Sequence, residues 1–332
     1  MVYIYKKMIG KVPYYYLRVS ERKGSRVIAK DIAYLGNSIE EMRKSLDSLP
    51  QFKEKIRKAH KTIHKVIESN HYLEKVASMK WKKDPYIGDR LAGIEACKLH
   101  FQSVFKKNDD ATKSEILKNF VIEFAFNTAS IEGNTITLQQ ARNLLEEGLT
   151  PKDKTLREIF DLQNTEKVFL SIIGSDEELS HEFIIRIHSG LMENIDARRG
   201  YRTTDVRVIR ANFKSTPAPY VKTDMGILLK WCNNIKKEMH PLAIATIFHH
   251  KFERIHPFMD GNGRAGRMLL NHFLMQNGYP PAIIHRKLRS EYLEHLREAD
   301  KSDLTKATKE DYSPLVLFIA DEMSEYYWNI FL

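Results

Sequence analysis

The hydrophobic pattern divides the chain into a short strand-rich beginning and a long helical remainder. Residues 2–5, 12–18 and 26–34 are rich in valine, isoleucine and tyrosine, and segments typical of turns separate them at 6–10 and 21–25. Such runs predict a small antiparallel sheet. Because three short strands bury little apolar surface on their own, we expect this sheet to pack against other elements.

Helical spacing dominates the chain after the predicted strands. Ser38 and Glu41 form a capping-box pattern that opens a first helix. Apolar residues at intervals of three and four predict a long, lysine-rich helix over residues 52–77 and another helix over 91–105. Further helices are expected at residues 114–129, 138–147, 156–173, 180–191, 224–236 and 241–253. The predicted fold class is therefore mainly α.

Residues 200–222 interrupt the helical pattern. They contain a β-like run at 206–209, followed by Pro217 and Pro219. This arrangement predicts an irregular hairpin between two helices. The edge of an isolated hairpin is a common place for an extended segment of another chain to pair.

Composition narrows the class of protein. The chain of 332 residues is long enough for one large or two smaller domains, and Cys97 and Cys232 are its only cysteines. Two cysteines predict no disulfide framework, so we expect a reducing, cytoplasmic location. No apolar run approaches the roughly 20 residues of a membrane-spanning helix, and residues 1–11 lack the pattern of a signal peptide. We therefore expect no membrane partner.

The net charge of +10 is concentrated near the N-terminus. Residues 1–110 hold 24 Lys and Arg against 13 Asp and Glu, whereas the remaining residues hold 29 against 30. The basic region can be interpreted as solvated helix faces, as a surface for a protein partner, or as a nucleic-acid-binding surface. With the polar residues at 106–110 as a boundary, we predict a β-rich segment at 1–45, a basic helical region at 46–110 and a further domain at 111–332.

Residues 256–267 concentrate chemically active side chains. An apolar run follows them and predicts a helix that ends before Gly278. A loop that enters a helix N-terminus presents free N–H groups and the positive end of the helix dipole, and both attract phosphate. Glycines allow close approach of the backbone to an anion. The candidate residues are His256, Asp260, Gly261, Asn262, Gly263, Arg264 and Arg267.

Two other features allow a structural and a functional interpretation. Glu132 lies at the predicted C-terminal end of a helix, before Gly133, where a carboxylate is unfavourable by a few tenths to about 1 kcal/mol unless a cation compensates it. It is either exposed to water or directed at an arginine from elsewhere in the chain. His249 and His250 precede the loop and favour packing or hydrogen bonding over metal ligation.

These motifs resemble those of a known family. Residues 256–267 match the Fic-domain signature H-P-F-x-D-G-N-G-R-x-x-R at every fixed position. Residues 128–133 resemble the inhibitory motif [S/T]-x-x-x-E-[G/N] of Fic proteins with an N-terminal inhibitory helix. Residues 278–281 and the surroundings of Tyr292 are similar to the animal Fic enzymes. The resemblance covers roughly residues 111–330.

The resemblance implies a fold and an activity. The fold is a helical bundle with a β-hairpin flap at 200–222, an inhibitory helix at 114–133 and a catalytic loop and helix at 256–277. The activity is that of a protein adenylyltransferase, which moves AMP from ATP to a Ser, Thr or Tyr hydroxyl of a target protein and of itself. Magnesium or manganese would accompany ATP. The target protein is not identified by the sequence, and assembly into a homo-oligomer stays open.

The resemblance also implies roles for single residues. His256 would be the base, Asp260 would hold the metal ion, and residues 261–264 with Arg267 would bind the phosphates. Glu132 would inhibit the enzyme by pairing with Arg267. The flap would dock the target through Thr204, Val206 and Val208, and Tyr292 would line the adenine pocket. Asp300 departs from the asparagine of the animal enzymes, which leaves the preferred base open.

Other functions use the same sequence features. Glu132 could activate water to remove AMP from a modified protein, with His256 as the acid. The basic N-terminal region could instead make the chain a regulator that binds DNA or a protein partner. A different nucleotide or group could also be transferred, because a fold does not fix the donor.

Overall fold

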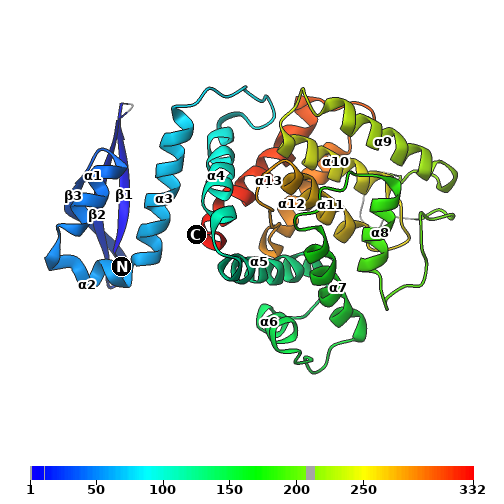
Figure 1. The fold of residues 1–332 in the computed structure, drawn as a ribbon, viewed down its shortest axis with the longest axis horizontal. Helices are drawn as coiled ribbons and strands as arrows, with labels where there is room; N and C mark the ends of the chain where they lie inside the picture. Colours follow the sequence, from blue (N-terminus) through cyan, green and yellow to red (C-terminus); the bar gives the residue numbers. More distant parts are fainter. Residues whose placement is uncertain (1, 11, 207–213) are drawn as a thin grey trace. The chain divides into compact units, whose positions relative to one another are not determined.

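The computed structural model describes residues 2–10, 12–206 and 214–332, and for Lys23 it describes the backbone. The chain forms two compact units (Figure 1). The N-terminal unit extends to Lys80 and takes in Leu332, and the C-terminal unit extends from Trp81 to Phe331.

The N-terminal unit is built on the predicted antiparallel sheet. Its strands β1 (Val2–Ile9), β2 (Val12–Lys23) and β3 (Arg26–Gly36) pair in the order β1-β2-β3. Alternate residues of β2, such as Tyr15 and Leu17, are fully buried. They join a core with Met42 of α1 (Ile39–Asp47) and Ile63 of α3 (His60–Ala77). The helices thus cover one face of the sheet.

The long helix predicted over residues 52–77 is divided in two. A 3-10 turn at Pro50–Phe52 leads into α2 (Lys53–Lys58), and Ala59 leaves the helical conformation with φ −104° and ψ 12° before α3 begins. Both Ile56 of α2 and Ile63 of α3 pack on the sheet core. The interruption at Ala59 thus lies between two helices that both contribute to one small core.

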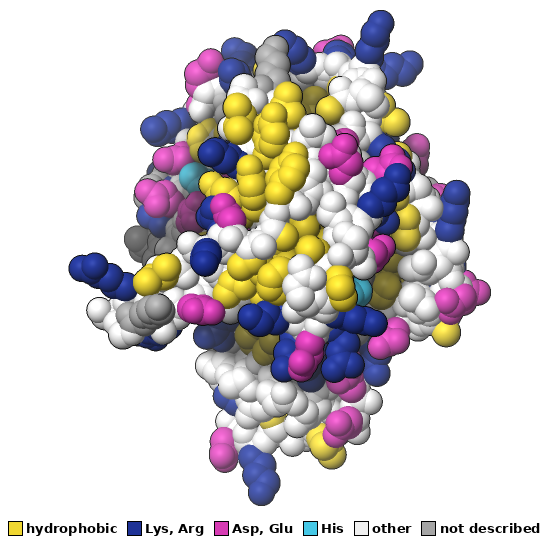
Figure 2. Space-filling model, turned by 90° about the vertical axis from the view of Figure 1, so that its left-hand side faces the viewer, with side chains coloured by type: hydrophobic (Ala, Val, Ile, Leu, Met, Phe, Trp, Pro, Cys, Tyr) yellow, Lys and Arg dark blue, Asp and Glu magenta, His cyan; other side chains and the backbone are white. Residues whose placement is uncertain are grey.

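Hydrophobic side chains also reach the molecular surface. Figure 2 shows a face on which they form a broken band, with lysine and arginine side chains along its margins. In the N-terminal unit, Val27 is 70% exposed and Tyr34 is 53% exposed.

The C-terminal unit is a helical bundle, as predicted. Its helices are α4 (Leu91–Ser103), α5 (Asp110–Ile131), α6 (Leu138–Glu147), α7 (Leu156–Ile172), α8 (His181–Leu191), α9 (Val221–Ile235), α10 (Pro241–Ile255), α11 (Asn262–Gln276), α12 (Arg289–Ala299) and α13 (Lys309–Ile330). Short 3-10 turns lie at Gly88–Arg90, Phe105–Lys107, Ala218–Tyr220 and Arg286–Leu288. The closely packed pair α10 and α11 contacts α5, α7, α8, α9 and α13 (Figure 1). Nearly every residue of α11 is buried, which fixes the loop in front of it.

The division between the units differs from the predicted boundary at residue 110. Helix α4 packs against α13, more than 200 residues later in the chain, and so belongs to the C-terminal unit. Lys80 to Lys83 are exposed and contain no helix or strand, and they form the connection. The predicted basic helical region at 46–110 is therefore split between the two units.

The described parts of the predicted flap contain no strand. Residues 203–206 and 214–217 have irregular backbone, followed by the 3-10 turn at Ala218–Tyr220. The two arms nevertheless lie side by side, because the Ser215 hydroxyl donates to the Val206 carbonyl at 3.1 Å and Asp205 accepts the Ala218 N–H at 2.7 Å. Val208 lies outside the described residues, so the hairpin stays a prediction. Over the described ranges, no helix has the length and apolar character needed to cross a membrane.

Candidate active site

The connection between α10 and α11 forms a tight loop. His256 caps α10 in the left-handed conformation with φ +52°, which is uncommon for a residue other than glycine. Gly261, with φ +75°, then turns the chain into α11. The N–H groups in the first turn of α11 have no acceptors within the helix, so they face the loop as anion-binding donors.

Arg202 holds this loop from beneath. Its buried guanidinium donates to the His256 carbonyl at 2.7 Å and to the Ile255 carbonyl at 3.3 Å. These bonds supply donors to carbonyl groups at the C-terminal end of α10, which have no partners within the helix. The same side chain donates to the carbonyls of Thr204 and Thr216, one on each arm of the flap segment. One arginine thus fixes both the loop and the base of the flap. No local sequence pattern predicts this role, since the residues that Arg202 links lie far apart in the chain.

Asn262 and His188 shape the loop interior. The Asn262 amide accepts the Phe258 N–H and donates to the Phe258 carbonyl, both at 2.9 Å. Phe258 stacks on His188 with ring centroids 3.6 Å apart, and His188 donates through Nε2 to the Asp260 carbonyl at 2.9 Å. Burial lowers the pKa of His188 to about 4, so its ring is neutral. The contacts with Phe258 use one of the two N–H groups of the Asn262 amide, so phosphate binding by Asn262 stays a prediction.

A contact with the backbone of α10 orients the His256 ring. Its Nδ1–H donates to the Glu253 carbonyl at 3.2 Å, which leaves the lone pair on Nε2. Burial lowers the pKa of the ring below its ordinary value of 6.5. His256 is therefore neutral near pH 7 and able to accept a proton.

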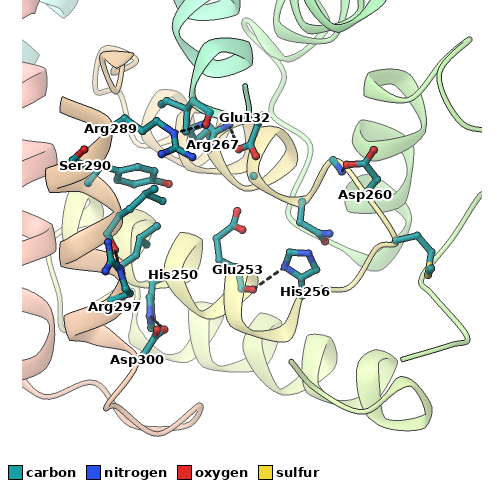
Figure 3. Close-up of a pocket in the computed structure, with 18 residues that line it drawn as sticks. Glu132, His250, Glu253, His256, Asp260, Arg267, Arg289, Ser290, Arg297 and Asp300 are labelled. Carbon is teal, nitrogen blue, oxygen red and sulfur yellow. Dashed lines mark hydrogen bonds and ion pairs between the residues drawn. The ribbon is translucent and has the colours of Figure 1, made fainter. Parts of the chain in front are cut away.

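His256 lies at the edge of a cavity of about 480 Å³ (Figure 3). At one end the cavity is bounded by the loop and the first turn of α11, including Asp260, Gly261 and Gly263. At the other end it is bounded by α12, including Tyr292 and Asp300. The cavity thus runs from an anion-binding helix terminus to a wall that includes an aromatic ring, an arrangement suited to a nucleotide.

Arg267 and Glu132 meet within this cavity. Arg267 Nη2 lies 2.7 Å from Glu132 Oε1, and its guanidinium also donates to the carbonyl and hydroxyl oxygens of Thr128 at 3.1 and 3.0 Å. All three acceptors come from the last turn of α5 and its cap. A Cβ at Gly263 would fall 2.1 Å from Glu132 Oε1, so the carboxylate lies directly over the first turn of α11.

A further arginine compensates the end of α5. Arg289 donates through Nε to the Ile131 carbonyl at 2.7 Å. With Arg267, it supplies the cations that a carboxylate at the negative end of a helix dipole requires. The interpretation of Glu132 as directed at an arginine therefore fits the geometry better than a glutamate that contacts water alone.

The other charged residues of the loop have partners as well. Asp260 forms an ion pair with Arg157, and Arg264 forms one with Asp161. Arg264 lines a neighbouring cavity of about 260 Å³ and does not line the main cavity. Burial alone would raise the pKa of Asp260, but its hydrogen bond with Arg157 takes the pKa below its ordinary value. Asp260 is therefore ionised near neutral pH.

The site fits a metal ion that arrives with a nucleotide. Within the described residues, no group of three or more His, Cys, Asp or Glu could hold an ion by itself. Asp260 is the one carboxylate of the loop, and it lies beside the helix terminus that would receive phosphate. One carboxylate together with phosphate oxygens is a common ligand set for Mg²⁺.

A second glutamate faces the cavity and was missed by the sequence analysis. Glu253, on the last turn of α10, points toward Glu132 and Arg267 (Figure 3). Its Oε1 atom is buried and has no hydrogen-bond partner among the described residues. Burial, followed by the charge of Glu132, raises the pKa of Glu253 to about 8. Glu253 is therefore a neutral acid near pH 7.

The paired histidines have hydrogen-bonding roles. His249 Nε2 lies 2.5 Å from the Tyr292 hydroxyl, and His250 lies between Tyr312 and Asp300 at 3.0 and 3.1 Å. These contacts fix the end of the cavity where the sequence placed the adenine. Thr204, from the predicted flap, donates to Met259 Sδ at 3.4 Å and so lies beside the loop.

Comparison with known proteins identifies relatives. Residues 178–274 match the model of the Fic/DOC family. The chain is 30% identical over 242 residues to a protein adenylyltransferase Fic of Drosophila willistoni, which covers 70% of this chain and 45% of that protein. It is 32% identical over 187 residues to the protein adenylyltransferase fic-1 of Caenorhabditis elegans, which covers 54% and 37%. The chain thus spans less than half the length of these relatives.

Solved structures give the same picture. A Fic-domain signaling protein from Bacteroides thetaiotaomicron is similar with a TM-score of 0.65 and 25% identity, over 71% of this chain and 95% of that one. Fic-1 of C. elegans has a TM-score of 0.59 over 89% of this chain and 83% of that one, and at 24% identity it supports the fold alone. The fully matched loop, its geometry and these relatives agree, and the chain is a member of the Fic/DOC family.

Proposed function

We propose that the protein is an adenylyltransferase that moves AMP from ATP to a Ser, Thr or Tyr hydroxyl of a target protein, and to itself. His256 Nε2 accepts the proton of the hydroxyl, whose oxygen forms a bond to the α-phosphorus. The bond between that phosphorus and the bridging oxygen breaks, and pyrophosphate leaves. The names of the curated relatives support this reaction.

One observation carries the proposal. The neutral His256, with its lone pair on Nε2, lies on the same cavity wall as the free N–H groups that begin α11. A base and an anion-binding terminus in one cavity are what attack on a phosphate requires. Asp260 would hold Mg²⁺ or Mn²⁺ on the phosphates, and the ion would neutralise charge on the leaving pyrophosphate.

We further propose that the resting enzyme is inhibited by Glu132. The carboxylate lies over Gly263 and occupies Arg267, so the terminal phosphates lose both a binding site and a cation. A hydrogen-bonded pair between arginine and a carboxylate is among the stronger polar contacts in proteins. ATP bound beside this pair would hold its α-phosphate out of line for attack.

The test compares self-modification with radiolabelled ATP and Mg²⁺, together with the added mass by mass spectrometry. Glu132→Gly should raise incorporation at least tenfold, and Glu132→Gly with His256→Ala should abolish it. Glu147→Gly is a matched control, because Glu147 also ends a helix before a glycine with positive φ but lies outside the cavity. Incorporation by Glu132→Gly no greater than by the control would refute the inhibition. A mass other than that of AMP would refute the choice of donor.

A second candidate reaction uses the same residues. Although Arg267 binds Oε1, the Glu132 side chain remains 45% exposed at the cavity, where a carboxylate can position water. Glu132 would then activate water to hydrolyse AMP from a modified protein. The measurement is release of AMP from protein already modified by the Glu132→Gly variant. Release by the wild type, and none by Glu132→Gly, would establish this reaction.

A further inference from the structure

The N-terminal unit carries a cluster of tyrosines that the proposed reaction does not use. Tyr5, Tyr16 and Tyr34 stand opposite one another on the three neighbouring strands. Tyr3 and Tyr14 follow the same alternation, so all five lie on the sheet face opposite the core. We call Tyr3, Tyr5, Tyr14, Tyr16 and Tyr34 the tyrosine face.

The rings of the tyrosine face remain accessible. Tyr34 is 53% exposed, and the other four are partly exposed. By contrast, Tyr15 points to the core between two of them and is fully buried. The ring centroids of Tyr16 and Tyr34 lie 5.4 Å apart, and those of Tyr14 and Tyr34 lie 6.3 Å apart. The rings of β2 and β3 thus lie side by side, and the tyrosines of β1 lie on the same face of the sheet.

Basic side chains lie among these rings. The Arg18 guanidinium lies 3.6 Å from the centroid of the Tyr5 ring. It also forms an ion pair with Asp31 at 2.6 Å, which neutralises the carboxylate opposite it on β3. Lys7 and Arg22 follow the same alternation and are exposed. Cations and aromatic rings therefore share one face.

The charge of the whole chain belongs to this unit. Residues 1–80 contain 18 Lys and Arg against 8 Asp and Glu, whereas residues 81–332 contain 35 of each. The entire net charge of +10 therefore lies on 80 residues. A polyanion is the partner whose charge complements this unit, and long-range attraction of this kind speeds association.

We propose that the tyrosine face binds single-stranded nucleic acid. Flat rings can stack with unpaired bases of any sequence, and neighbouring lysines and arginines can contact the phosphates. Stacking on aromatic residues of an open sheet is an established way to bind single strands. An acidic protein segment would match the charge but would gain little from a row of five flat rings, so the aromatic row favours nucleic acid.

The test uses the full-length chain and fluorescence anisotropy. The probes are labelled single-stranded DNA and RNA of about 20 nucleotides and a duplex of the same sequence, a length that exceeds one sheet-sized binding site. We expect both single strands to bind more tightly than the duplex. Affinity should fall as salt rises, with a logarithmic slope of about −0.7 per phosphate contacted. The ratio of the two affinities shows whether the tyrosine face prefers single-stranded DNA or single-stranded RNA.

Substitutions separate stacking from charge. Tyr16→Thr with Tyr34→Thr should weaken binding roughly tenfold or more, since each stacked base contributes substantially to affinity. Tyr16→Phe with Tyr34→Phe keeps both rings and should retain binding, which also guards against loss of folding. Tyr220→Thr is the matched control, because Tyr220 is 61% exposed but lies in the C-terminal unit.

Three results would overturn the proposal. The first is the absence of salt-sensitive binding to either single strand. The second is equal binding by the double threonine variant and the wild type. The third is competition by polyglutamate as strong as that by an unlabelled strand of equal charge, which would make this a surface for acidic protein segments.

Discussion

At the scale of single residues, the cavity sets two glutamates of different character beside one arginine. Glu132 is half-exposed and paired with Arg267, whereas Glu253 is buried and neutral near pH 7. Burial keeps Glu253 protonated, and the charge of Glu132 adds to this effect because a second ionised carboxylate so close would be repelled. Any condition that ionises Glu253 would change the balance of charge around Arg267.

This arrangement predicts a pH dependence of stability. The pKa of Glu253 rises from an ordinary value of 4.5 to about 8 on folding, so between these values the folded state binds the extra proton. Stability is then fully present below about pH 4.5 and falls as the pH rises toward 8. Glu253→Gln keeps a neutral side chain, so its melting temperature should decline less steeply from pH 5 to 8 than that of the wild type. Parallel curves for the two proteins, measured by calorimetry, would contradict the assignment.

The sequence identified the residues of the loop but not the residues that support it. The spacing of residues 256–267 singles out His256 and Arg267 because the signature is local. Arg202, His188 and Glu253 act through partners far away in the chain or through burial. Long-range contacts and burial leave no local pattern in the sequence, so the roles of these three residues could be recognised only from the folded structure.

At the scale of elements, the close approach of α10 and α11 depends on Gly266. A Cβ at this position would lie 2.6 Å from both Glu253 Oε1 and His249 Nδ1. The His249 side chain is fully buried and that of Glu253 is only 17% exposed, so neither can move away easily. Glycine in the middle of α11 therefore reflects packing, against its poor helix propensity.

Gly266→Ala should destabilise the protein, although alanine has a higher helix propensity than glycine. We expect a net loss of about 1–3 kcal/mol from overpacking, seen as a lower melting temperature. Gly226→Ala in α9 is the matched control, because its Cβ would lie 3.6 Å from the nearest atom, an ordinary contact. The control should be neutral or stabilise by up to about 1 kcal/mol, as expected for alanine in a helix. Equal melting temperatures for the two variants would show that the α10–α11 contact can relax.

Element positions followed from the sequence where the pattern was strong. The three strands begin where the β-rich runs begin, and helix α6 has the predicted bounds. The bend at Ala59 was missed because an amphipathic stripe continues across it, and the small core of the sheet decides where the helix must turn. Helix α4 was predicted to belong to the basic helical region, but it packs against α13. Local pattern did not reveal this contact, because α13 lies at the other end of the chain.

At the scale of the whole molecule, the cavity and the net charge belong to different units. The residues that line the cavity lie between Ile131 and Asp300, and the excess positive charge lies in residues 1–80. The sequence showed that charge was uneven but placed the boundary about 30 residues too late. The structure thus separates a basic unit from an electrically neutral family domain.

Deletion of residues 1–80 should therefore leave nucleotide binding intact. In the Glu132→Gly background, we expect the fragment from Trp81 onward to bind ATP with unchanged affinity by calorimetry, because a domain with its own core can fold alone. The same fragment should no longer be retained by a cation exchanger at pH 7, since its 35 basic residues and the 34 acidic residues that remain without Glu132 nearly balance. Circular dichroism of the fragment serves as the folding control. A folded fragment that no longer binds ATP would place N-terminal residues in the site.

The division at Lys80 also has an optical consequence. The three tryptophans of the chain, Trp81, Trp231 and Trp328, all lie in the C-terminal unit, whereas the sheet of the N-terminal unit is rich in tyrosine. Light absorbed by indole alone therefore reports on the unit that holds the nucleotide cavity. Emission from the phenol rings carries a signal from the tyrosine face as well. A single unlabelled sample can thus distinguish an event at the cavity from an event at the sheet by the wavelength of excitation.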